Sequence, residues 1–177
     1  GKTWVFKGVS GMRAYVEEAA GKSPTIPSWI GEMLPLSFDS AVEVGKFREE
    51  AGEMIKGKNR QKVLGWLKKE YALDDRAASQ IYDYFAQQYS YAKKVPSASL
   101  ILVEEYFDGD GHQNIIFHAL FGRRTNDALS RAYAYKIAKE CKTNVAVTIN
   151  DNGFILKSGK KIDVRKAAKI VRSTEIE

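Results

Sequence analysis

The sequence predicts an α+β fold, in which antiparallel strands pack with helices. Two N-terminal segments, 3–9 and 13–17, are rich in aromatic and β-branched residues and flank a Ser10-Gly11 turn, which is typical of a hairpin. A run of helical periodicity follows, and beyond residue 99 the pattern returns to short strands around a helix. Because strands and helices do not alternate regularly, a doubly wound nucleotide-binding sheet is excluded.

The middle of the chain is expected to form three consecutive helices. Each has apolar residues at helical spacing and a polar residue that can cap its start or a breaker at its end. The expected helices run from Ser37 or Asp39 to Gly57, from Arg60 to Tyr71, and from Asp74 to Ala92. We expect this three-helix segment to separate the N-terminal hairpin from a later sheet.

The second half of the chain is expected to form that sheet, with one further helix packed on it. Turn signals at 108–111 and 151–153 separate the strands of two hairpins. The expected elements are strands 99–107 and 113–119, a helix over 125–141, strands 144–149 and 154–157, and a last helix that Asp163 caps. We therefore expect one domain over 1–158 and a C-terminal helix or tail over 159–177.

Composition sets further limits. The 177 residues include 44% hydrophobic residues, enough for a buried core, but the apolar runs are far shorter than the ~20 residues of a membrane span. We therefore expect no membrane partner. The one cysteine, Cys141, excludes an internal disulfide and fits a reducing, cytoplasmic location. The start without a methionine indicates a segment of a longer protein.

The chain is basic, with a formal net charge of +6, which mildly favours polyanionic partners. Six basic residues and no acid lie between Lys56 and Lys69, and seven basic residues with one acid lie between Lys157 and Arg172. Solvated helix faces explain such runs as well as binding does. The sequence contains no phosphate-binding loop, dinucleotide fingerprint, nucleophile elbow or zinc signature, so no catalytic machinery, metal or cofactor is expected within it.

Trp29 is the first candidate binding residue. It lies in a loop stiffened by three of the four prolines and is followed closely by Gly31, so its ring can be presented to an unpaired base. Stacking of this kind contributes roughly 1–3 kcal/mol per base. The alternative is that Trp29 fills the gap between the sheet and the first helix.

The second candidate is the turn from a strand into the helix expected at Thr125. Thr125 or Asn126 can cap that helix, and its first-turn amides, with Arg123 and Arg124 beside them, would form a phosphate site. In the alternative interpretation, this is a structural turn whose arginines pair with surface carboxylates.

Five blocks of the sequence form a recognisable pattern: Pro27–Glu32, Leu73–Ala78, Val95-Pro96, Leu102–Glu104 and Phe117–Asn126. In their order and spacing they resemble the large helicase-related (Lhr) family, and more narrowly the DEAD/H-associated domain of its archaeal-type members. The resemblance covers about residues 3–157.

The resemblance implies a C-terminal piece of a superfamily 2, ATP-dependent helicase that unwinds DNA or RNA–DNA hybrids and is linked to DNA repair. This chain lacks the ATP-site motifs, so it is not expected to be an enzyme by itself; ATP and Mg²⁺ would bind to RecA-like motor domains upstream, followed by a winged helix. The family implies an aromatic that stacks on the tracked strand, and Trp29 matches that position. Two functions stay open: an accessory domain that contacts the single strand, or a module that docks the motor without binding nucleic acid.

Overall fold

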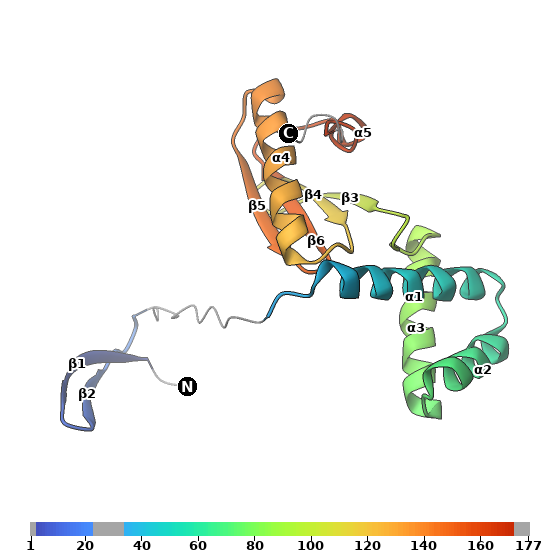
Figure 1. Cartoon of the computed structure of the whole chain (residues 1–177). Helices are drawn as coiled ribbons and strands as arrows, with labels where there is room; N and C mark the ends of the chain where they lie inside the picture. Colours follow the sequence, from blue (N-terminus) through green and yellow to red (C-terminus); the bar gives the residue numbers. More distant parts are fainter. Residues whose placement is uncertain (1–2, 23–33, 172–177) are drawn as a thin grey trace. The chain divides into compact units, whose positions relative to one another are not determined.

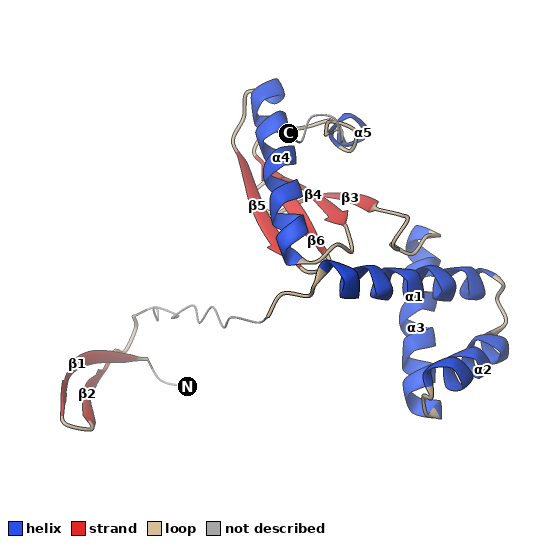
Figure 2. Ribbon diagram, viewed as in Figure 1, coloured by secondary structure: helices blue, strands red, loops and turns tan. Residues whose placement is uncertain are grey.

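The computed structural model describes residues 3–22 and 34–171, in two compact units, Gly1–Leu34 and Pro35–Glu177. The described residues form five helices and two antiparallel sheets, of two and four strands, which confirms the α+β prediction (Figures 1 and 2).

The first unit is the expected hairpin, with β1 over Trp4–Ser10 and β2 over Arg13–Glu18. Gly11, with a φ of 59°, closes the turn, and the register pairs Phe6 with Val16 and Val9 with Ala14. Residues paired across a ladder lie on the same face, so this face of the hairpin is mainly apolar, with Glu18 opposite Trp4 at its end. Trp4, Phe6, Val9 and Val16 are each more than half exposed.

The second unit begins with the three expected helices, α1 over Phe38–Lys56, α2 over Arg60–Tyr71 and α3 over Asp75–Ala92. Each has a side-chain N-cap, because the oxygens of Ser37, Asn59 and Asp74 accept from the amide three residues later. Their shared core consists of Ala51, Ile55, Val63, Leu67, Ala78, Phe85 and Val95.

A four-stranded antiparallel sheet follows, with the strand order β3-β4-β6-β5 (Figure 2). Its strands are β3 (Leu102–Phe107), β4 (Gln113–His118), β5 (Val145–Asn150) and β6 (Gly153–Ser158). α4 (Arg123–Cys141) packs against β5 and β6. The residues of the core on this side of the sheet include Ile115, Phe117, Ile137, Phe154 and Leu156.

The helix after β6 is shorter than expected. α5 covers only Val164–Ala167, capped by Asp163, whose carboxylate accepts from the amides of Arg165 and Lys166. Ile162 and Ala167 nevertheless belong to the core of the sheet. The buried side chain of Gln113 donates to the Ile162 carbonyl at 2.8 Å and accepts from the Ile162 amide at 2.6 Å. The part of 159–177 that the structure describes is thus fastened to the sheet.

Across residues 3–22 and 34–171, no helix combines the length and the apolar character that a membrane crossing requires.

Candidate nucleic-acid interface

The turn from β4 into α4 holds four of the five predicted site residues. α4 begins at Arg123, two residues earlier than predicted, and Gly122 occupies its N-cap position without a side-chain hydrogen bond. The expectation that Thr125 or Asn126 caps the helix is therefore wrong. Gly122 has a φ of 78°, and a Cβ there would lie 2.5 Å from the Leu36 carbonyl oxygen, so the chain needs glycine to pass this point.

Asp151, in the turn between β5 and β6, fills the role of the missing cap. Its Oδ1 accepts from the amides of Arg123 and Leu36, each at 3.0 Å. The first turn of α4 contains no acidic residue, so Asp151 brings a negative charge to the positive end of the helix from a distant part of the sequence. One carboxylate thereby joins the start of α4, the segment before α1 and the β5–β6 turn.

Arg123 is held by the same carboxylate. Its Nη2 lies 3.7 Å from Asp151 Oδ2, and its side chain is about one-third exposed. Its Nε is buried and has no partner among the described residues. Arg123 thus follows the alternative interpretation, in which an arginine at this turn pairs with a carboxylate.

Asn126 lies in the interior and is fully shielded from solvent. Its Nδ2 donates to the carbonyls of Ala119, Asn150 and Asp151, at 2.9 to 3.3 Å. These bonds fasten the β4–α4 turn to the β5–β6 turn. The Asn126 side chain therefore joins the two turns and is not open to solvent in this structure.

Arg124 and Thr125 complete the turn. Arg124 is exposed, and no acidic partner is found for it within the described ranges, whereas Thr125 is half-buried. The guanidinium of Arg124 is therefore exposed, as a contact with a phosphate would require. Trp29, the fifth predicted residue, lies outside the described residues.

Sequence reasoning identified the turn and its arginines but missed Asp151. The Asp151-Asn152-Gly153 sequence indicated only a hairpin turn, and no local signal connects it to a helix that begins 28 residues earlier. The buried position of Asn126 also depends on that tertiary contact.

The first basic run is largely paired, whereas ion pairs are found for two residues of the second. In the run 56–69, four residues meet acids: Lys56 with Glu53, Arg60 with Asp83, Lys68 with Asp75, and Lys69 with Glu70. In the second run, Lys157 lies 2.7 Å from Asp108 and Lys166 lies 2.9 Å from Glu140. Pairs of this kind are typical of solvated surfaces, so the paired residues of these runs do not by themselves define a binding site.

The chain is similar to known proteins over nearly its whole length. Residues 95–177 match the family model described as DEAD/H associated. The chain is 50% identical over 158 residues to the ATP-dependent helicase Lhr-Core of Saccharolobus solfataricus, covering 88% of this chain and 18% of that protein. It is 44% identical over 163 residues to the Methanothermobacter thermautotrophicus helicase of the same name, covering 92% of this chain and 19% of that protein.

A solved structure has the same fold. The helicase Lhr of Mycobacterium smegmatis, in a structure described as bound to ssDNA and AMP-PNP, matches with a TM-score of 0.71 at 20% identity. The match covers 89% of this chain and 19% of that one, so this chain spans about a fifth of the length of its relatives.

Residues 95–177, a little under half of the chain, thus match the family model described as DEAD/H associated. More narrowly, nearly its whole length is homologous to a segment of the Lhr-Core helicases, which confirms the resemblance to the Lhr family.

Proposed function

We propose that this chain is a nucleic-acid-binding accessory domain of an ATP-dependent, Lhr-type helicase and contacts the single strand along which the motor moves. The observation that carries the proposal is the 50% identity to an ATP-dependent helicase Lhr-Core over most of the chain. The likeness of the fold to part of a helicase described as bound to ssDNA supports it.

The proposal divides the work between this chain and the rest of a longer protein. ATP and Mg²⁺ would bind to RecA-like motor domains upstream, and a winged helix would lie between the motor and this chain. DNA or an RNA–DNA hybrid would be the substrate of the whole protein. This chain would supply contacts to the unpaired strand, with Trp29 stacking on a base and Arg124 meeting a phosphate.

A comparison of the wild-type chain with Trp29→Ala tests this proposal. If Trp29 stacks on a base, the variant should bind a fluorescent single-stranded oligonucleotide about five- to 150-fold more weakly, at an unchanged melting temperature. If Trp29 is instead a core residue, the substitution should cost about 3–5 kcal/mol of stability. A fall in melting temperature of more than about ten degrees would therefore end the stacking interpretation, because ~1 kcal/mol moves the midpoint of a domain of this size by only a few degrees.

The exposed apolar face of the β1–β2 hairpin favours a second function, that of a docking module. Two-stranded hairpins are marginally stable alone in water, and a face that carries Trp4, Phe6, Val9 and Val16 gains stability when another surface covers it. The surface in question would belong to the motor or winged-helix part of the longer protein.

Mutation of that face separates the two functions. In the docking function, Phe6→Ser should weaken the association of this chain with the upstream domains, added as a separate protein, whereas Trp29→Ala should not. Retention of the complex by Phe6→Ser would count against docking through the hairpin. The matched control is Lys7→Ser, which changes the neighbouring residue and removes only its exposed ion pair with Glu17.

A further inference from the structure

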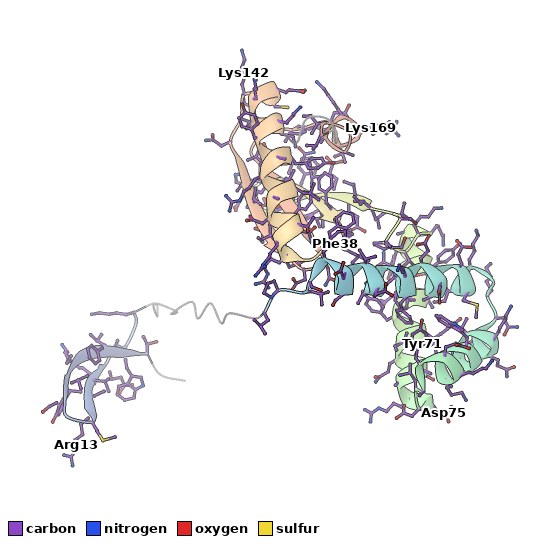
Figure 3. All side chains as sticks on the ribbon, in the orientation of Figure 1. Arg13, Phe38, Tyr71, Asp75, Lys142 and Lys169 are labelled. Carbon is purple, nitrogen blue, oxygen red and sulfur yellow. The ribbon has the colours of Figure 1, made fainter. Side chains whose placement is uncertain are left out.

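The outer face of α4 carries a regular stripe of exposed residues. They recur every three or four positions, which places them along one side of the helix. The stripe consists of Arg124, Ala128, Arg131, Tyr135, Lys139 and Lys142. The helix rises about 1.5 Å per residue, so the stripe runs for about 27 Å, from the turn described above to Lys142 at the far end of α4 (Figure 3).

The stripe is positively charged. Four of its six residues are cations, and of these Arg131 pairs with an acid, Asp127, at 2.8 Å. For Arg124, Lys139 and Lys142, no acidic partner is found in the part of the chain that the structure describes. Glu140, the other acid of α4, is engaged by Lys166 at 2.9 Å. β5, which packs beside α4, contains no charged residue, so nothing on that strand neutralises the stripe.

An exposed aromatic ring stands in the middle of these cations. Tyr135 is 66% exposed, and no aromatic contact is found for it within the described residues. Arg131 and Lys139 lie one helical turn before and after it. Positive side chains that flank an exposed ring are the combination that binds single strands without sequence preference, because cations meet phosphates while a base stacks on the ring.

We propose that this stripe of α4 is a binding surface for single-stranded nucleic acid, with a base on Tyr135 and phosphates on Arg124, Lys139 and Lys142. The inference rests on the proposed nucleic-acid-binding function and extends its path from Arg124 along the whole helix. Charge complementarity selects a polyanion as the occupant. The exposed ring selects a nucleic acid with unpaired bases over an acidic protein surface, which offers no bases to stack.

Binding of a fluorescent oligo(dT) to the full 177-residue chain, measured at several salt concentrations, tests the proposal. Tyr135→Ala should weaken binding about five- to 150-fold and leave the salt dependence unchanged, because it removes stacking without removing charge. Arg124→Ala and Lys139→Ala should each make the slope of log K against log salt shallower by about 0.7, because each removes one phosphate contact. All three side chains are exposed, so the melting temperatures should stay at the wild-type value.

Two matched controls lie on other helices. Tyr91→Ala removes an 80% exposed tyrosine from α3, and Lys62→Ala removes an exposed cation from α2. Both should bind as the wild type does. If the wild-type chain binds the oligonucleotide and the α4 variants bind it as tightly as these controls, the proposed binding surface on α4 is overturned while the proposed function stands. If the wild-type chain does not bind, both fail. Two further results would overturn the proposed binding surface on α4. One is an equal loss of oligonucleotide affinity in Tyr135→Ala and Tyr91→Ala. The other is an acidic peptide that competes with the oligonucleotide and whose binding is equally sensitive to Tyr135→Ala.

Discussion

Asp151 shows how one side chain can determine the geometry of a site that its own sequence position does not reveal. Its carboxylate accepts hydrogen bonds from the backbone amides of Leu36 and Arg123 and also faces the Arg123 guanidinium. The sequence placed arginines at this turn correctly. It could not show which of them is free, because the partner of Arg123 comes from a tertiary contact.

Substitution of Asp151 tests this role. Asp151→Ala should destabilise the chain by about 1–3 kcal/mol, because two partly buried amides lose their acceptor. Asp151→Asn keeps one acceptor oxygen and should cost less. Urea unfolding measures both. Asp110→Ala, at an exposed position in another hairpin turn, is the control and should stay within about 0.5 kcal/mol of the wild type. An Asp151→Ala variant as stable as this control would contradict the role.

Asp108 leads to a prediction about pH. A hydrogen bond from the Lys157 ammonium, together with those from the His112 amide and the Asn114 side chain, holds the pKa of the Asp108 carboxyl well below its ordinary value. Because the pKa of this carboxyl is lower in the folded chain than in the unfolded chain, ionised Asp108 stabilises the fold above about pH 3.9. This stabilisation is lost progressively as the pH falls below that value.

Melting of the wild type and Asp108→Asn from pH 3 to pH 7 measures this contribution. The wild type should have the higher melting temperature at pH 5–7. The difference in melting temperature between the two proteins should decrease as the pH falls below about 4. Asp110→Asn, as control, should show a much smaller difference. A difference in melting temperature between the wild type and Asp108→Asn that stays constant down to pH 3 would contradict the prediction.

At the scale of elements, α1 shows where periodicity succeeds and where it fails. The apolar spacing predicted the helix, and Ser37, one of the two predicted caps, is its N-cap. Val44 has helical spacing with the buried Ala41 and Ala51, yet it is 42% exposed, whereas the neighbouring Gly45 is buried. Gly45 lies so close to the loop at Ala98 that a Cβ would be 2.8 Å from the Ala98 nitrogen. Glycine has no side chain and so does not contribute to a hydrophobic periodicity. The sequence pattern therefore could not predict this contact.

Two glycine substitutions in helices should therefore have opposite signs. Gly45→Ala should destabilise the chain although alanine is the better helix former, because its Cβ would collide with the Ala98 backbone. Gly65→Ala, in α2, has open space around the added methyl and should stabilise by about 0.4–1 kcal/mol. Chemical denaturation of both variants gives the signs, and stabilisation by Gly45→Ala would show that the close approach is absent.

The hairpin, taken as a unit by itself, has only two strands. As a peptide of residues 3–22, it should show little β-structure by circular dichroism in dilute solution, because two strands alone bury too little apolar surface. A well-formed, monomeric hairpin in isolation would contradict the view that its apolar face needs a partner.

At the scale of the whole molecule, the order of elements followed from the sequence because caps, turns and periodicity agreed with one another. The α+β class, the three middle helices and the sheet after residue 99 were all predicted. The α4 stripe was not singled out, because its exposed face depends on which side of the helix packs against β5 and β6. The family resemblance rested on blocks of sequence, and the comparisons confirmed it.

The most direct test of the account is the binding of single-stranded DNA to the wild-type chain at 50 mM and 200 mM salt. If three cations of this chain meet phosphates, the affinity should fall by roughly 20-fold between the two conditions, as counterion release from a single strand requires. Absence of binding at 50 mM salt, or equal affinity at both concentrations, would contradict the claim that this chain binds the nucleic-acid backbone.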